Sequence, residues 1–186
     1  MEKDRLKWNE KYLKETYPDE PAGTVKEYYH LAPKGRALDI GAGNGRNALF
    51  LAKQGVDVIA VDISDVAMAG LAGVHPRLHP LCQDLDTFEI PKECFSLIVN
   101  IRFLNRRLFP QIREGLIPGG LLIFESFIKT PEKKISGPLC PDHLLLENEL
   151  LHAFLSLKIL FYQEKKHHSC KESAYIASLV ARKNRS

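Results

Sequence analysis

The sequence predicts an α/β protein built around a mostly parallel β-sheet. From Arg36 onward, short apolar segments with the pattern of buried strands alternate with segments of helical periodicity, and such alternation requires parallel strands joined by helices. A glycine-rich turn follows the first of these strands. Two strand-like segments close the chain with only a short connection between them, so this last pair must be antiparallel.

The individual elements follow from periodicity and from turn residues. A charged amphipathic helix is expected at 4–17, ended by two prolines, and a second helix at 22–31. Strands are expected at 36–41, 56–62, 78–85, 95–103, 121–127, 157–166 and 174–182, the fifth of them after a Pro-Gly-Gly turn at 118–120. Further helices are expected at 44–54, after an N-cap at Ser64, at 105–116 and at 147–155.

Size and composition are those of one globular domain. The chain has 186 residues, of which 45% are hydrophobic and 26% charged, so we expect a single domain over 1–186, with the helices of residues 1–34 as a lid over a core at 36–183. No apolar run approaches the roughly 18 residues that span a bilayer. The charged N-terminus leads into no apolar signal segment. We therefore expect no membrane association and a cytoplasmic location.

The main functional signal is the loop between the first strand and the following helix. It reads Asp39-Ile-Gly41-Ala-Gly43-Asn-Gly45, and its glycines allow a tight turn and the close approach of a ligand to the main chain. Such a loop alone is also compatible with a plain strand–helix turn. The second strand, however, ends in Asp62, where a carboxylate would accept hydrogen bonds from ribose hydroxyls. Together these residues predict a nucleoside-bearing cofactor.

Four motifs in the same order resemble the class I S-adenosylmethionine-dependent methyltransferases. They are D-x-G-x-G-x-G at 39–45, Gln-Asp-Leu at 83–85 after the third strand, the fourth strand at 95–100, and the Pro-Gly-Gly run into the fifth strand at 116–123. Ser96 stands where the family commonly has an aspartate. The short length and Trp-Asn-Glu-Lys-Tyr at 8–12 are similar to the small tellurite-resistance-type methyltransferases of that family.

This resemblance implies a Rossmann-like three-layer sandwich with seven strands in the order 3-2-1-4-5-7-6 and the last strand antiparallel. It also implies S-adenosylmethionine as cofactor and S-adenosylhomocysteine as product. Trp8 and Tyr12 lie one helical turn apart, where they would either belong to the core or close over a cationic sulfonium. The expected cofactor-binding residues are Asp39, Gly41, Ala42, Gly43, Asn44, Gly45, Asp62, Ile63, Asp84, Leu85, Asn100, Tyr12 and Trp8.

The acceptor should lie beyond the carboxyl ends of the fourth and fifth strands. Arg102, Arg106 and Arg107 follow the fourth strand, and Glu125 ends the fifth. Guanidinium groups bind oxyanions well, although charges at such positions are often ordinary surface groups. We expect Arg102, Arg106 and Glu125 to contact a small soft or anionic acceptor, namely a thiol, a metalloid oxyanion or a small metabolite. No residue is assigned a catalytic role.

Two other functions stay open. The chain carries a formal charge of +3, and its basic residues gather from Lys158 onward, which would suit an RNA or protein methyltransferase with a large substrate, or a solvated sheet edge. A non-catalytic S-adenosylmethionine-binding module is the other alternative. We expect a small-molecule substrate and a monomer or homodimer, with nucleic acid not excluded.

Cysteine and histidine suggest a metal site only weakly. Cys140, His143, His167, His168 and Cys170 would lie at the same end of the sheet and could hold zinc. They show no repeated C-x-x-C spacing, and we therefore expect no metal. The other two cysteines, at positions 82 and 94, are expected to be small buried groups.

Overall fold

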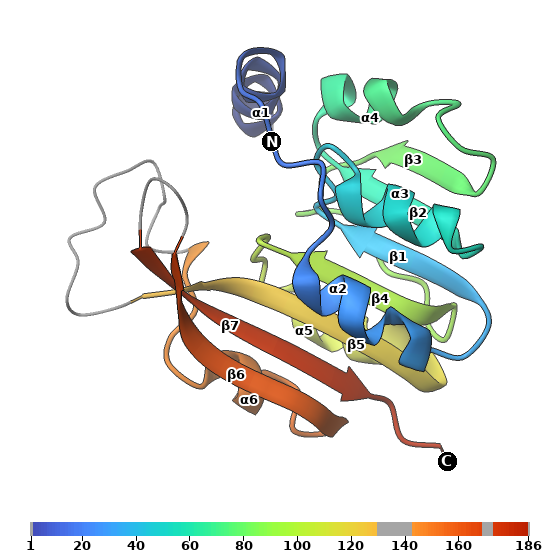
Figure 1. Cartoon of the computed structure of the whole chain (residues 1–186), viewed down its shortest axis with the longest axis vertical. Helices are drawn as coiled ribbons and strands as arrows, with labels where there is room; N and C mark the ends of the chain where they lie inside the picture. Colours follow the sequence, from blue (N-terminus) through green and yellow to red (C-terminus); the bar gives the residue numbers. More distant parts are fainter. Residues whose placement is uncertain (1, 130–142, 169–172, 186) are drawn as a thin grey trace.

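A seven-stranded β-sheet forms the centre of the structure (Figure 1). The structure is a computed structural model that describes residues 2–129, 143–168 and 173–185. The strands are β1 (Arg36–Ile40), β2 (Asp57–Asp62), β3 (Leu78–Cys82), β4 (Phe95–Ile101), β5 (Leu116–Ile128), β6 (Lys158–His168) and β7 (Ser173–Arg182). Their order is β3-β2-β1-β4-β5-β7-β6, which confirms the expected order.

The strand directions also agree with the prediction. β1 pairs in parallel with β2 and β4, β2 with β3, and β4 with β5. β7 is antiparallel to both of its neighbours, β5 and β6. Because the carboxyl ends of parallel strands meet at one edge, the loops that follow β1 to β5 lie together there, where open α/β sheets bind ligands.

Helices cover both faces of the sheet. They are α1 (Glu2–Lys14), α2 (Gly23–Tyr28) with the short 3₁₀ turn η1 (Tyr29–Leu31), α3 (Arg46–Lys53), α4 (Asp65–Leu71), α5 (Leu108–Gly115) and α6 (Glu149–Ala153). Buried residues of α2, α3 and α4 pack into one apolar cluster and those of α5 and α6 into another. Successive residues of a strand belong to alternate clusters, because side chains alternate across a strand. In β4, for example, Leu97 and Val99 belong to the cluster beneath α2, α3 and α4, and Ile98 belongs to the cluster beneath α5 and α6. The result is a three-layer sandwich.

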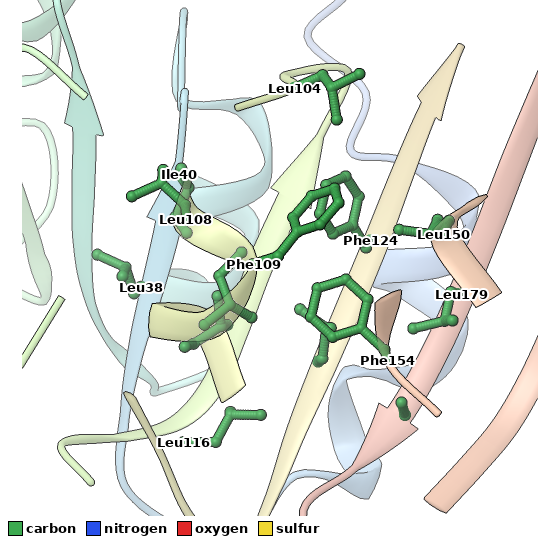
Figure 2. Packing of buried hydrophobic residues seen from close by; sticks show 14 of the residues in the cluster. Leu38, Ile40, Leu104, Leu108, Phe109, Leu116, Phe124, Leu150, Phe154 and Leu179 are labelled. Carbon is green, nitrogen blue, oxygen red and sulfur yellow. The ribbon is translucent and has the colours of Figure 1, made fainter. Parts of the chain in front are cut away.

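The cluster beneath α5 and α6 is rich in aromatic rings (Figure 2). The Phe109, Phe124 and Phe154 rings meet pairwise, with centroids 5.8, 5.3 and 5.9 Å apart. Phe124 and Phe154 are fully buried, and truncating such a ring to alanine costs about 3–5 kcal/mol. This cluster fixes α5 and α6 against the sheet, and so fixes the loop between β4 and α5 at the functional edge.

Two predicted boundaries near the N-terminus and β3 are wrong. The helix expected at 4–17 ends at Lys14; beyond it the chain turns back, and the Tyr17 ring packs against Tyr12 with centroids 4.8 Å apart. The strand expected at 78–85 ends at Cys82. There an Asp84 carboxylate oxygen accepts a hydrogen bond of 2.9 Å from the backbone N–H two residues later, which makes a turn that competes with strand pairing.

Two further boundaries differ around α5 and β5. The helix expected at 105–116 begins at Leu108, because the Asn105 side chain accepts a hydrogen bond from the backbone N–H of Arg107 and forms a turn first. β5 begins at Leu116 and includes the Pro-Gly-Gly segment expected as a turn. Gly119 lies there with φ 80°, and its N–H bonds to the carbonyl oxygen of Lys183, so the C-terminal segment pairs with this stretch.

Helix α1 lies outside the two clusters. None of its residues is buried, and it packs against α4, as Figure 1 also shows. Leu6 and Leu13 are 60% and 73% exposed. Among the described residues no helix has the length and apolar character needed to cross a bilayer.

Candidate functional site

The glycine loop at the end of β1 has the strained geometry that only glycine adopts readily. Gly41, Gly43 and Gly45 have φ values of 65°, 57° and 74°, all in the left-handed region. A Cβ at Gly41 would lie 2.7 Å from the Phe103 ring, and one at Gly43 would collide with the Tyr12 hydroxyl. Each of these glycines therefore has two independent reasons to lack a side chain.

Asp62 at the end of β2 is joined directly to this loop. Its carboxylate accepts hydrogen bonds of 2.9 Å from the backbone N–H groups of Gly43 and Ser64, and the residue is 8% exposed. Burial raises the pKa of the Asp62 carboxyl, and the backbone N–H groups oppose this by stabilising the anion. Sequence reasoning placed Asp62 beside the loop, and the structure adds that it holds the loop in shape.

Asp39 and Asn100 lie buried under the loop, on the adjacent strands β1 and β4. Within the described chain, one Asp39 carboxylate oxygen and both Asn100 amide atoms have no hydrogen-bond partner. Burial raises the pKa of Asp39 to about 7, opposed by the N–H of Ala48 and the charge of Arg46. An unsatisfied buried polar group costs about 1–3 kcal/mol. The fold leaves three polar atoms unpaired at the edge where open α/β sheets bind ligands. These atoms therefore point to a role in binding a ligand, since they do not stabilise the fold.

A hollow of about 330 Å³ lies beyond β2 and β3. Ile63 and Asp84, both expected to bind the cofactor, line it together with Gln83, and α1 contributes Glu2 and Arg5. The volume is at the lower end of the range for ligand pockets. A larger hollow of about 570 Å³ lies at the amino ends of β1 and β2, away from every predicted site residue.

The neighbouring Leu85 is held in place by two side chains of the next loop. It is 5% exposed, and its carbonyl oxygen accepts hydrogen bonds of 3.3 Å from Asn105 and 3.1 Å from Arg107. Arg107 also pairs with Glu89 at 2.8 Å. The structure thus gives Arg107 a role in fixing the segment after β3. Cys82, expected to be buried, is exposed and lines the 330 Å³ hollow.

Helix α1 covers the glycine loop through its aromatic face. The Trp8 and Tyr12 ring centroids are 6.0 Å apart, and the Tyr12 hydroxyl lies against Gly43. Burial, and then the charge of Asp62, raise the pKa of the Tyr12 hydroxyl well above its ordinary value. Asn44 in the loop donates a hydrogen bond of 3.0 Å to the carbonyl oxygen of Pro18, which ties the segment after α1 to the same loop.

Asn9 fastens α1 to the start of α4 and was missed by sequence reasoning. Its amide oxygen accepts a hydrogen bond of 2.7 Å from the Ser64 hydroxyl, and its amide nitrogen donates to the Asp65 carboxylate. The Ser64 hydroxyl also accepts from the N–H of Ala67, which confirms the predicted N-cap. The sequence offered one signal for this role of Asn9, namely a short amide side chain between two aromatic residues of the same helix.

Glu125, at the end of β5, has partners on two other elements. One carboxylate oxygen accepts hydrogen bonds from the hydroxyls of Ser178 at 3.2 Å and Thr24 at 3.5 Å. The backbone N–H of Arg102 donates to the carbonyl oxygen of Glu125 at 2.6 Å, and the Arg102 guanidinium lies 5.5 Å from the centroid of the Phe127 ring. The structure therefore places Arg102 and Glu125 next to each other through their backbones, and their contact with an acceptor stays a prediction.

Arg46, which sequence reasoning missed, lies within electrostatic range of this group and donates a hydrogen bond of 3.2 Å to the carbonyl oxygen of Glu20. Burial lowers the pKa of its guanidinium, the nearby positive charge of Arg102 lowers it further, and Glu125 and Asp39 oppose both effects. Arg46 is the first residue of α3, where the helix dipole disfavours a positive charge. An arginine in this unfavourable position, directly after the glycine loop, was the sequence signal that could have pointed to Arg46.

Arg106 lies in a different environment from Arg102. It forms a two-pronged ion pair with Glu149 of α6, with nitrogen–oxygen distances of 2.5 and 2.9 Å, and it donates to the carbonyl oxygen of Leu144 at 2.8 Å. These contacts join the start of α5 to α6. The structure does not bring Arg106 together with Glu125.

The cysteines and histidines considered for a metal site are only partly described. Cys140 and Cys170 lie outside the described residues, as do the side chains of the two histidines at 167 and 168. His143 is exposed. Over residues 2–129, 143–168 and 173–185 there is no cluster of three or more potential metal ligands.

Comparison with known proteins shows which proteins the chain resembles. Residues 37–120 match a family model described as a methyltransferase domain. Hemagglutinin 1 of Eikenella corrodens is 28% identical over 75% of this chain and 49% of that protein. The ribosomal protein L11 methyltransferase of Thermus thermophilus is 32% identical over 54% of this chain and 41% of that protein.

The third relative is a probable S-adenosyl-L-methionine-dependent methyltransferase, TehB, of Haemophilus influenzae, 27% identical over 76% of this chain and 52% of that protein. The crystal structure of TehB from this organism superposes with a TM-score of 0.78 at 22% identity, covering 97% of this chain and 67% of that one. The chain thus spans about half the length of the curated relatives it matches. Residues 37–120 thus match a methyltransferase domain, and the chain resembles the TehB proteins in sequence and in fold.

Proposed function

We propose that the protein is an S-adenosylmethionine-dependent methyltransferase that acts on a small soft or anionic acceptor in the cytoplasm. The observation that carries the proposal is the convergence of three features at the carboxyl edge of the sheet. They are the glycine loop braced by Asp62, the buried polar atoms of Asp39 and Asn100 that lack partners in the described chain, and the charged group around Glu125. A cofactor site beside an acceptor site is what methyl transfer requires.

The residues present fit the cofactor. Asp62 offers carboxylate oxygens to ribose hydroxyls, and the hollow that Ile63 and Asp84 line is large enough for a base. Asp39 and Asn100 offer a carboxyl oxygen and an amide oxygen to the ammonium group of an amino-acid moiety, and the Asn100 amide nitrogen could donate to an acceptor of the same ligand. When bound, S-adenosylmethionine supplies a methyl group already activated by its sulfonium.

The protein's own contribution is then alignment and exclusion of water. Holding two reactants in line is worth an effective concentration of about 10⁵–10⁸ M. Tyr12 lies against the loop at Gly43 and packs beside Trp8, and an aromatic face at this position would stabilise a cation. Glu125 is oriented by two hydroxyl groups and stands where it could accept a hydrogen bond from a protonated acceptor.

Two observations favour a small acceptor over RNA or protein. Helix α1 lies across the site, with Asn9 tied to α4 and the Tyr12 hydroxyl against Gly43, which supports the role of residues 1–34 as a lid. Two of the basic C-terminal residues are also engaged within the chain. Lys183 bonds to Glu93 at 3.2 Å and to the carbonyl oxygen of Leu116 at 2.7 Å, and Arg182 donates to a carbonyl oxygen of η1.

Calorimetry with S-adenosylhomocysteine and a turnover screen test the proposal. We expect the protein to bind S-adenosylhomocysteine. We also expect it to form S-adenosylhomocysteine when S-adenosylmethionine is supplied together with thiols or metalloid oxyanions. Failure to bind S-adenosylhomocysteine would refute the proposed function. Binding without turnover on any acceptor would indicate a non-catalytic module, and turnover only on RNA or on a protein would refute the small acceptor.

A further inference from the structure

We propose that the hollow at the amino ends of β1 and β2 binds a small phosphorylated molecule. The hollow has a volume of about 570 Å³, within the range of small-molecule sites. It lies opposite the arrowheads of β1 and β2 in Figure 1, and the five residues of β1 separate it from the glycine loop by about 16 Å. Such a site is separate from the proposed active site, because the residues that line it include none of those assigned to the cofactor or the acceptor.

The walls of the hollow come from segments that are far apart in the sequence. They are the stretch from η1 to the start of β1, the end of α3 with the start of β2, and the start of β4. The Tyr29 hydroxyl donates a hydrogen bond of 3.1 Å to the Gln54 side chain, which joins the first two of these segments. The Tyr29 ring also meets the Phe50 ring edge-on, with centroids 5.3 Å apart. Packed and hydrogen-bonded elements therefore set the shape of the hollow.

Two cationic side chains, Lys34 and Arg36, line the hollow. Both residues are exposed, and within the residues that the structure describes neither side chain forms a salt bridge. The acidic residue of the lining, Asp57, pairs at 3.1 Å with Arg77, which does not line the hollow. The positive charges of Lys34 and Arg36 are therefore not paired with an anion of the described chain.

The backbone between the two cationic residues is fixed by β4. Gly35 packs so closely that a Cβ there would lie 2.8 Å from the Cβ of Ser96. The Ser96 hydroxyl donates a hydrogen bond of 3.1 Å to the carbonyl oxygen of Arg36. Because this stretch is already ordered, a ligand that binds Lys34 and Arg36 does not have to order their backbone, which lowers the entropic cost of binding.

A structural role at the end of α3 does not account for the two cations. Lysine and arginine are favoured near a helix C-terminus because the last carbonyl oxygens lack partners within the helix. In α3, however, the carbonyl oxygens of residues 50–52 accept hydrogen bonds from the backbone N–H groups of residues 54–56. The chain itself thus satisfies this helix end, which leaves the charges of Lys34 and Arg36 available to a ligand.

A phosphate monoester matches this hollow in charge and in polarity. It carries a charge of about −1.5 to −2 at pH 7, which balances one ammonium and one guanidinium group, and its oxygens accept hydrogen bonds from both. The hollow has room for more than a phosphate group. Its apolar lining, which would pack against the rest of the ligand, consists of Ala32, Pro33, Val56 and Leu97.

Phenyl phosphate, inorganic phosphate and benzyl alcohol test the site by calorimetry. They carry both parts of the expected ligand, the anion alone and the apolar part alone. Each is titrated into the whole protein, with and without saturating S-adenosylhomocysteine. We expect phenyl phosphate to bind at least about tenfold more tightly than the other two. Its affinity should be the same with S-adenosylhomocysteine, because the two sites lie at opposite ends of the strands.

Two variants and a matched control locate the bound probe. Lys34→Gln and Arg36→Gln should each weaken phenyl phosphate binding by about tenfold, the loss expected for one hydrogen bond between charged groups. Lys165→Gln removes the same charge from an exposed position on β6, at the far edge of the sheet, and should leave the affinity unchanged. Because Lys34 and Arg36 are exposed, their replacement should preserve the fold, which thermal melts check.

Several outcomes would overturn the site. They are the absence of phenyl phosphate binding, binding that neither Lys34→Gln nor Arg36→Gln weakens, and binding that S-adenosylhomocysteine abolishes, which would place the probe in the cofactor site. Equal affinity for inorganic phosphate would overturn the phosphorylated organic ligand. Phenyl phosphate binding that depends on Lys34 and Arg36 in a protein that fails to bind S-adenosylhomocysteine would refute the proposed function and leave this site standing.

Discussion

Replacing Asp39 with asparagine tests whether this buried carboxyl serves a ligand at the expense of stability. Asp39 is 1% exposed, one of its oxygens has no partner in the described part of the chain, and burial raises its pKa from 3.8 to about 7. At about 1.36 kcal/mol per pH unit, that difference corresponds to a destabilisation of about 4 kcal/mol when the carboxyl is ionised.

The sign of the pH dependence follows from the raised pKa. Between about pH 4 and pH 7 the folded protein keeps a proton on Asp39 that the unfolded chain has lost, so the free energy of unfolding falls as the pH rises through this range. Asparagine cannot ionise. Asp39→Asn should therefore be more stable than the unmodified protein at about pH 8, by about 2–4 kcal/mol, and should show little gain at about pH 4.

The same variant should bind S-adenosylhomocysteine at least about tenfold more weakly, because the carboxylate that would meet the cofactor's ammonium group is gone. Urea unfolding at the two pH values and calorimetry at pH 8 are the measurements. Asp57→Asn is the control, since this exposed carboxylate in a surface ion pair contributes about 0–1 kcal/mol. An Asp39→Asn variant less stable at pH 8, or one with unchanged affinity, would refute the reasoning.

The remaining predictions concern the loop and its cover. Asp62→Ala should weaken S-adenosylhomocysteine binding by at least about a hundredfold in calorimetry, because two ribose hydrogen bonds to a charged acceptor would be lost at about 1.5–3 kcal/mol each. Gly43→Ala should nearly abolish that binding, whereas Gly55→Ala, which has φ 87° but open space around it, should cost only about 1–2 kcal/mol in stability. Asn9→Ala removes hydrogen bonds of Asn9 to Ser64 and Asp65 and should shift the emission of Trp8, the single tryptophan, toward that of an exposed indole.

Each of these expectations has a clear contrary result. Unchanged affinity in Asp62→Ala would remove that carboxylate from the cofactor site. Equal ligand affinities in Gly43→Ala and Gly55→Ala would mean that the close approach at Gly43 has no bearing on binding. Trp8 emission indifferent both to Asn9→Ala and to saturating S-adenosylhomocysteine would rule out a lid that responds to the ligand.

Much of the fold could be predicted from local patterns in the sequence. Buried strands and helices differ in periodicity, and the alternation of the two from Arg36 onward leaves few topologies for the sheet. Two of the predicted element boundaries were wrong because a side chain accepts a hydrogen bond from the backbone two residues later. Asp84 and Asn105 both close turns where the pattern favoured a continued element, because such local bonds compete with strand or helix pairing and leave no trace in hydrophobic spacing.

The candidate site, like the fold, could be predicted only in part from the sequence. The sequence by itself determined the glycine loop and Asp62, because the loop's backbone conformation demands glycine and its motif is contiguous. Only the tertiary structure decided which partners each arginine near the site has. Arg106 forms an ion pair with Glu149, 43 residues away, whereas Arg46 donates a hydrogen bond to the carbonyl oxygen of Glu20, although both carry the same side chain beside a predicted site. The one Asp39 oxygen that lacks a partner is likewise a result of burial by distant segments. Charge and desolvation act through space, so their balance is fixed only when the packed neighbours of each group are known.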